Sequence, residues 1–204
     1  MSIIKVKIVN SNFLVILINY FFYLNLLKLK KSITPAMHKT VLKSWEKVDI
    51  PILATYFNNI RIWNNLRDYI PHPYTEDDAT KFIEAQEVID PIQNFSILHE
   101  DELCGGIGII LKEDIYRMNV ELAYWIAEPF WGKGIATEAV RQMTEYTFEK
   151  FAINRIIAEV FEYNPSSMRV LEKNGYYLQS VSRKGVLKND YLYDNYIWIK
   201  QKIY

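Results

Sequence analysis

The sequence predicts a mixed α/β (α+β) fold with elements in the order β-α-α-β-β-β-α-β-α-β-β. One observation is the direct succession of a strand, a glycine-containing turn and a helix between Val120 and Phe151. A second is that short polar turns, at Glu100-Asp101 and around Lys188 to Asp190, join pairs of apolar runs as they do in hairpins. A third is that two helical patterns begin at residues suited to cap a helix, Thr75 and Asn164.

The first strand is predicted over Thr40 to Trp45, where apolar and polar residues alternate. A helical pattern opens at Val48-Asp49 and continues through Phe57. The next helix has Thr75 as its N-cap and Glu76, Asp77 and Asp78 in its first turn, where acidic side chains complement the helix dipole. We therefore interpret this acidic run as a helix start, and not as an acidic cleft that would favour a polyamine or aminoglycoside.

The runs Asn94 to His99 and Leu103 to Leu111 predict a hairpin that turns at Glu100-Asp101. Glycines at positions 105, 106 and 108 weaken the second strand unless another backbone approaches closely there or a bulge forms. They do not predict a phosphate loop, because the residues after them continue the strand.

The central unit begins with an apolar strand over Val120 to Ala127 and turns through Gly132 and Gly134 into a helix. Such a turn points free backbone N–H groups and a helix dipole at one spot, which favours phosphate binding. It is not a P-loop, since Gly132-Lys133 is followed by glycine, and it lacks the third glycine of a Rossmann fingerprint. From this segment alone, a tight turn without a ligand stays an equal alternative.

The C-terminal part continues the alternation of strands and helices. Asn154 to Phe161 reads as a strand, and Asn164-Pro165 starts a short helix with Asn as N-cap. Asn174-Gly175 closes this helix in the way that a left-handed C-terminal cap requires. Two final strands are predicted over Tyr176 to Ser182 and Tyr191 to Lys200.

Composition bounds the class of function. Lys and Arg balance Asp and Glu at 24 each among 204 residues, so bulk charge gives no reason to expect a nucleic-acid partner. The lone cysteine, Cys104, excludes an intrachain disulfide, and its apolar strand suggests a buried thiol in a reducing, cytoplasmic setting. No metal site is expected, because His38, His72 and His99 lie far apart in the sequence.

The first 36 residues differ from the rest, and we expect a domain boundary there, with a second domain over 37–204. Phe13 to Leu27 is apolar and flanked by lysines, but its fifteen residues are short for a membrane span of about 20. Upstream translation or a dispensable extension, a membrane anchor and a packed extra helix stay open as alternatives. A membrane partner is expected only through this segment.

The loop Trp-Gly-Lys-Gly-Ile-Ala and the later run from Asn164 to Tyr176 together resemble the GNAT superfamily of acyl-CoA-dependent N-acetyltransferases, in its RimJ/RimL-type branch. The family's pyrophosphate loop reads Gln/Arg-x-x-Gly-x-Gly/Ala, which the chain matches except at Trp131. The resemblance runs from about Lys39 to the C-terminus. It implies a mostly antiparallel, twisted mixed sheet with helices on both faces, and acetyl-CoA as co-substrate without a metal.

The resemblance also assigns residues to the acyl donor. The pyrophosphate would be held by backbone amides of Trp131, Gly132, Lys133, Gly134, Ile135 and Ala136, with charge from Lys133. The backbone of Trp125, Ile126 and Ala127 would bind the pantetheine arm, with the Ile126 N–H as oxyanion donor. Asn164 would contact the pantetheine, although as the N-cap before a proline it also has a complete structural explanation. On the acceptor side we expect aromatic residues such as Trp63, Tyr69 and Tyr74.

Two catalytic residues are expected. Glu121 lies in largely apolar company on its strand, so we predict that desolvation raises its pKa toward that of a useful general base. The alternative is a strand-end carboxylate paired with lysine or arginine. Many family members carry a tyrosine acid where this chain has Leu171, so Ser167 of the Asn-x-x-Ser motif is our choice to protonate the thiolate, unless it only caps the helix.

The sequence therefore predicts an acetyl-CoA-dependent N-acetyltransferase that moves an acetyl group to a primary amine by direct transfer in a ternary complex. The acceptor is a protein N-terminus or a small-molecule amine, and the sequence does not choose between them. A non-catalytic acyl-CoA-binding sensor or scaffold is the alternative, and a membrane-tethered interaction protein is a third hypothesis. A homodimer is also left open.

Overall fold

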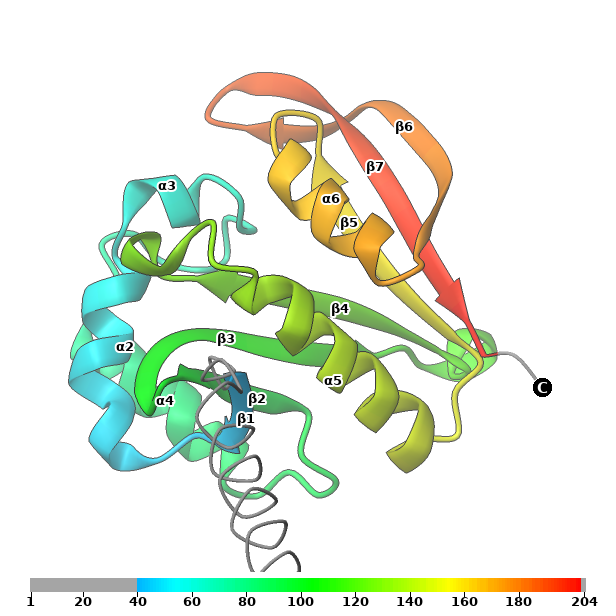
Figure 1. Ribbon diagram of the computed structural model, residues 1–204. Coiled ribbons are helices and arrows are strands. Elements are labelled where there is room, and N and C mark those ends of the chain that lie inside the picture. Colours follow the sequence, from blue (N-terminus) through cyan, green and yellow to red (C-terminus); the bar gives the residue numbers. More distant parts are fainter. Residues whose placement is uncertain (1–39, 203–204) are drawn as a thin grey trace, which may run out of the picture. The chain divides into compact units, whose positions relative to one another are not determined.

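The computed structural model describes residues 40–202, which form a seven-stranded sheet with helices on both of its faces (Figure 1). The strand order is β1-β2-β3-β4-β5-β7-β6. Neighbouring strands are antiparallel except for β4 and β5, which run parallel. The predicted mixed, mostly antiparallel sheet is thus confirmed. The segment 1–36 and the expected boundary after it lie outside the described residues.

The strands are β1 (Thr40–Ser44), β2 (Asn94–His99), β3 (Glu102–Leu111), β4 (Asn119–Ile126), β5 (Arg155–Phe161), β6 (Tyr177–Lys188) and β7 (Tyr191–Gln201). The helices are α2 (Ile50–Phe57), α3 (Ile60–Trp63), α4 (Glu76–Gln86), α5 (Ile135–Lys150) and α6 (Pro165–Lys173), with short 3₁₀ turns η1 (Lys47–Asp49), η2 (Asp114–Tyr116) and η3 (Glu128–Phe130). Helix α3 was not predicted, because four residues are too few to show a helical period.

Two clusters of buried side chains lie on opposite faces of the sheet. One packs under α5 and α6 and includes Leu122 of β4. The other packs under α2 and α4, and Trp125 of β4 reaches it, with its ring 5.0 Å from that of Phe57. Because successive side chains of a strand point to opposite faces, the even-numbered residues of β4 face α5 and α6 and the odd-numbered ones face α2 to α4.

The predicted helix caps are present. The Thr75 hydroxyl accepts from the Asp78 N–H and the Asp78 carboxylate accepts from the Thr75 N–H, so the acidic run is the capping box of α4. Asn164 caps α6 by accepting from the Ser167 N–H at 3.1 Å. At the other end of α6, Gly175 has a φ of +71°, the left-handed conformation expected there.

The glycines of β3 serve close packing, as predicted. A bulge interrupts the pairing of β2 and β3 between Ile97 and Leu98. A Cβ on Gly105 would lie 2.3 Å from the Trp125 carbonyl oxygen. Next to the bulge, Cys104 is fully buried, and burial raises the pKa of its thiol to about 12. Because a Cβ at position 105 would collide with the Trp125 carbonyl, only glycine there allows β3 to approach β4 this closely.

The final hairpin is longer than the sequence predicts, because β6 continues to Lys188. The register shifts between Leu178 and Ser180 and again between Ser182 and Val186. Lys184, within the second shift, has a φ of +50°. These irregularities break the period-two pattern on which the prediction relied, so the extension carries no readable signal.

Candidate active site

Strands β4 and β5 separate to form the site. Their parallel ladder spans only Asn119↔Arg155 to Glu121↔Ile157, and the strands diverge beyond it (Figure 1). A cavity of about 810 Å³ fills the opening. Its walls come from β4, β5, the loop before α5, the start of α6 and the segment after α3. A sheet that splits in this way exposes backbone groups that a continuous ladder would pair.

The register of β4 against β3 turns some of these backbone groups toward the opening. The Ala127 N–H donates to the Cys104 carbonyl at 2.8 Å, which makes Ile126 and Gly105 a non-hydrogen-bonded pair. The N–H and C=O of Ile126 therefore face away from β3. Hydrogen-bonded and non-hydrogen-bonded pairs alternate, so the same holds for Tyr124. Both amides point toward the cavity.

The backbones of Trp125, Ile126 and Ala127 were expected to bind an extended ligand, and this geometry leaves only some of their N–H and C=O groups free to do so. Trp125 pairs with Gly106 in the hydrogen-bonded position, so its N–H and C=O face β3. The Ala127 N–H already donates to the Cys104 carbonyl. The Ile126 carbonyl accepts from the Trp131 indole at 2.6 Å, which leaves the Ile126 N–H as the group free to face a ligand.

The loop before α5 has the conformation of an anion site. Gly132 and Gly134 have φ values of +77° and +78°, and Gly134 is the N-cap of α5. The Trp131 N–H is engaged with the Glu128 carbonyl at 3.2 Å. The amides of 132–136 find no backbone acceptor within residues 40–202, and most of these residues line the cavity. Free amides at a helix N-terminus suit a pyrophosphate.

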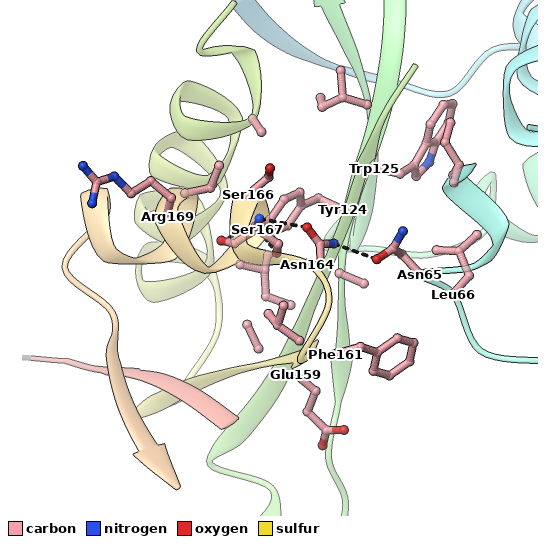
Figure 2. A pocket seen from close by; sticks show the side chains of 18 of the residues that line it. Asn65, Leu66, Tyr124, Trp125, Glu159, Phe161, Asn164, Ser166, Ser167 and Arg169 are labelled. Atoms are coloured by element: carbon pink, nitrogen blue, oxygen red, sulfur yellow. Dashed lines mark hydrogen bonds between the residues drawn. The ribbon is translucent and has the colours of Figure 1, made fainter. Parts of the chain in front are cut away.

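At the end of the cavity next to the loop before α5, the cationic side chains that line it come from α6. The Lys133 ammonium lies 4.9 Å from the centre of the Phe130 ring, and Lys133 is not among the residues that line the cavity. Arg169 and Lys173 do line it. Figure 2 shows Arg169 projecting from α6. Sequence reasoning missed this pair, although its i, i+4 spacing on a predicted helix was a readable signal.

Ser167 lies in the first turn of α6, where its hydroxyl is 2.7 Å from the Tyr124 hydroxyl. Burial raises the pKa of Tyr124 to about 12, so this phenol keeps its proton at neutral pH. Tyr124 was not among the candidate site residues predicted from the sequence. The Asn164 carboxamide joins Ser167 to the facing segment, because its Nδ2 donates to Asn65 Oδ1 at 2.9 Å (Figure 2).

Glu121 is buried on the face of the sheet that carries α2 to α4, where it meets two cations. Arg67 donates to one carboxylate oxygen, and Lys112 donates to the other at 2.7 Å. Burial alone would raise the pKa of Glu121, but the hydrogen bonds and charges of Lys112 and Arg67 outweigh it and lower the pKa below its ordinary value. The predicted raised pKa is therefore wrong, since Glu121 is a paired carboxylate.

A second carboxylate, Glu159, faces the same part of the cavity. In the parallel ladder Ile157 lies beside Glu121, so Glu159, two residues on, points to the same face at the level of Ala123. Asn195 Nδ2 donates to Glu159 Oε2 at 2.9 Å, and the Glu159 side chain is exposed. Glu159 was not predicted, although it carries the same sequence signal as Glu121, because it too is an acidic residue within an apolar strand.

The segment after α3 is held against the C-terminal half of the domain by several hydrogen bonds, three of which we call the clasp. They are the Tyr163 hydroxyl with the Asn64 carbonyl (2.5 Å), Asn164 Nδ2 with Asn65 Oδ1 (2.9 Å) and Lys188 Nζ with Asp68 Oδ1 (2.6 Å). Lys188 is 2% exposed, and its ammonium lies 3.4 Å from the centre of the Trp63 ring. The clasp fixes the backbone on both sides of Arg67.

The expected aromatic residues take different places. Tyr69 lines the cavity, as predicted for the acceptor side. Tyr74 is buried against Phe57, and Trp63 supports Lys188, so neither faces the cavity. His72 is exposed beside Trp63 and does not line the cavity.

Over residues 40–202, no three His, Cys, Asp or Glu side chains gather as a metal ion would require. In the same residues, no helix has the length and apolar character needed to cross a membrane.

Comparison with known sequences places this geometry in context. A family model described as "Acetyltransferase (GNAT) domain" matches residues 39–177. The chain is 40% identical over 121 residues to "Probable N-acetyltransferase YjcK" of Bacillus subtilis, covering 57% of this chain and 67% of that protein. It is 34% identical over 98 residues to "Putative ribosomal N-acetyltransferase YdaF" of Bacillus subtilis, covering 48% of this chain and only 53% of that protein.

Comparison with solved structures supports the same fold. RimL, titled "Ribosomal L7/L12 alpha-N-protein acetyltransferase in complex with Coenzyme A", matches with a TM-score of 0.70. The match covers 82% of this chain and 96% of that chain at 16% identity, so it speaks for the fold alone.

Proposed function

The chain belongs to the GNAT family of acetyltransferases and is an acetyl-CoA-dependent N-acetyltransferase, and we propose that it transfers the acetyl group directly to a primary amine in a ternary complex. The acceptor is a protein N-terminus or a small-molecule amine. One observation carries the proposal. The cavity runs from the free amides of the α5 loop, along the unpaired edge of β4, to the carboxylate Glu159 on the other face of the sheet.

The donor lies on the face of α5 and α6. The amides of 132–136 hold the pyrophosphate, and Arg169 and Lys173 add positive charge. The pantetheine arm then follows β4 away from the loop, with the Ile126 N–H as its first backbone donor. Asn164 lies beside this path and keeps its proposed contact with the arm.

The thioester lies one step further along β4, at Tyr124. Ser167, the proposed proton donor to sulfur, is bonded to the Tyr124 hydroxyl, so the sulfur belongs at this level. The Tyr124 N–H faces the opening and becomes the oxyanion donor, the role expected of Ile126 from the resemblance. Ile126 is too close to the pyrophosphate loop to serve both ends of the arm.

The acceptor amine enters from the face of α2 to α4, over the small side chain of Ala123. Its neutral nitrogen attacks the thioester carbon, the C–S bond breaks, and the thiolate takes a proton from Ser167. Ser167 regains a proton from Tyr124, and solvent returns the proton to Tyr124. Glu159 accepts the proton that the nitrogen loses. Glu121 becomes a positioning residue in this proposal, because both of its oxygens hold cations.

Calorimetric titration of acetyl-CoA tests the donor half, with Gly134→Trp as the variant in which a side chain fills the loop. We expect micromolar-range binding to the natural chain and none to the variant. A thiol-release assay with primary amines then tests transfer. Binding without release for any amine would favour the sensor or scaffold alternative, and no binding by a folded chain would end the proposal.

A further inference from the structure

Arg67 presents unused hydrogen-bond donors to the acceptor part of the cavity. Its side chain is 47% exposed and lines the cavity, and within residues 40–202 its side chain donates to Glu121 alone. A guanidinium carries five N–H donors in a rigid fork, so most of them remain for a ligand. Lys112 takes the other Glu121 oxygen, so one carboxylate faces two cations and leaves positive charge at this point.

The position of this guanidinium is fixed from two sides. Glu121, with 8% of its side chain exposed, holds the tip of Arg67. The clasp holds the backbone through Asn64, Asn65 and Asp68, next to Arg67 in sequence. A cation held in this way loses little freedom on binding a ligand, which is how binding sites gain affinity.

The charge changes sign along the cavity. Arg67 lies at the level of Glu121, whereas Glu159 lies two strand residues further, beside the proposed position of the amine. The pKa of Arg67 is raised because the charges of Glu121 and then Glu159 outweigh its burial, so Glu159 is close enough to act on it. Two residues of strand correspond to about 7 Å. The acceptor part thus has an anionic end and a cationic end.

We propose that the acceptor is a primary amine that carries a carboxylate about 7 Å from its nitrogen, and that Arg67 binds this carboxylate. The inference rests on the proposed function and deepens it. A planar guanidinium pairs with a carboxylate through two parallel hydrogen bonds. A polyamine, which places a second ammonium at that distance, meets Arg67 and is disfavoured.

Matched acceptor pairs test the inference with the full chain. The peptide pair is Ser-Asp-Ala-amide and Ser-Asn-Ala-amide, and the small-molecule pair is 5-aminopentanoate and 5-aminopentanamide. We expect thiol release with at least one acid, at a kcat/KM about tenfold or more above that of its amide partner. The arm that shows the preference identifies the source of the carboxylate.

Arg67→Met should remove this preference, mainly by raising KM for the acid, while acetyl-CoA affinity measured by calorimetry stays unchanged because Arg67 lies far from the loop. Arg117→Met is the matched control. Its guanidinium bonds the Asp114 carbonyl on the surface outside the cavity, and the variant should keep the preference.

Equal rates within both pairs, faster release with spermine, or a preference that survives in Arg67→Met would overturn the inference and leave the proposed function standing. No release with any of these amines by a chain that binds acetyl-CoA would count against both.

Discussion

Ser167 and Tyr124 are close enough to act on the thioester sulfur as one unit. Their hydroxyls are 2.7 Å apart, and the raised pKa of Tyr124 keeps a proton available. We expect Ser167→Ala to lower kcat by about tenfold to a hundredfold. Tyr124→Phe should lower kcat by about threefold to tenfold and have little further effect in the Ser167→Ala background, because residues that act as a unit are not additive.

Tyr176→Phe is the control for this cycle. The Tyr176 hydroxyl is bonded to Thr144 at 2.8 Å in the core and does not line the cavity. Its loss should lower the free energy of unfolding by about 1 kcal/mol and leave kcat within about twofold. Thiol-release rates for the four chains of the cycle decide the matter, since independent effects of Ser167→Ala and Tyr124→Phe would contradict the shared role.

Glu121 stabilises the fold in a pH-dependent way that follows from its lowered pKa. Its folded pKa lies below the ordinary 4.5. A depressed pKa gives stability that is present above the unfolded value and is lost as pH falls through the folded value. We expect Glu121→Gln to lower the free energy of unfolding by about 1–3 kcal/mol near neutral pH, because Arg67 and Lys112 lose their partner.

Urea unfolding of the natural chain and Glu121→Gln at about pH 7 and about pH 3.5 measures this difference. It should shrink at the lower pH, because the stability that the natural carboxylate adds is lost as pH falls below the unfolded value and through the lowered folded pKa. Glu159→Gln is the contrasting variant, because an exposed side chain should change stability by less than about 0.5 kcal/mol. A Glu121→Gln difference that stays constant with pH would contradict the paired carboxylate.

At the scale of elements, the loop before α5 and the end of α6 use glycine in the same conformation for different purposes. Gly132 and Gly175 have φ values of +77° and +71°. Alanine in this conformation costs about 1–2 kcal/mol, so both Gly→Ala changes should lower the free energy of unfolding similarly. Gly132→Ala alone should weaken acetyl-CoA binding, by about tenfold, because its loop must relax and turn its amides away.

Denaturation with calorimetric titration of both variants makes this comparison. Gly175→Ala serves as the control for the backbone penalty, since Gly175 ends α6 outside the cavity. Equal acetyl-CoA affinity in the two variants would mean that the loop amides do not bind the donor.

Elements whose signals are local could be predicted from the sequence. The capping box at Thr75, the N-cap at Asn164 and the hairpin turn at Glu100-Asp101 depend on residues within a few positions of one another. The strand, turn and helix around Gly134 could be read for the same reason. The irregular strand β6 could not be predicted in this way, because its bulges depend on its pairing with β7 and leave no local pattern in its own sequence.

The site was less predictable, because its geometry depends on contacts between distant segments. The pKa of Glu121 is lowered by Lys112, which follows β3, and by Arg67, 54 positions away. The register of β4 against β3 decides which backbone amides face the cavity. A shift of one residue in this register would turn the Trp125 amide toward the cavity in place of the Ile126 amide. An apolar strand context alone indicates burial of Glu121, but it cannot reveal the cations that pair with it.

At the scale of the whole molecule, the opening between β4 and β5 connects two faces of one sheet. Even-numbered residues of β4 lie on the side of the proposed acyl donor, and odd-numbered ones lie on the side of the proposed acceptor. Direct transfer needs both substrates at one carbon atom, and an opening through the sheet lets them approach it from opposite sides. The GNAT family predicted from the sequence is confirmed by the family match and by the similarity to YjcK.

The last prediction concerns residues 1–36, whose role stays a proposal. We propose that they are dispensable for catalysis and that a fragment starting at Met37 keeps acetyl-CoA affinity and kcat within about twofold of the full chain. The reason lies in β1, which is anchored from its first residue. The Thr40 hydroxyl lies 3.0 Å from His99 Nδ1, and Gln142 of α5 donates to the Thr40 carbonyl at 2.8 Å.

Calorimetry and thiol release on the fragment, with fractionation of cells that express each form, separate the alternatives. A fragment that loses activity although it is folded would make residues 1–36 part of the enzyme. A full chain in the membrane fraction beside a freely soluble, fully active fragment would make them an anchor. Equal activity and equal distribution are expected if they are an extension that the acetyltransferase domain does not need.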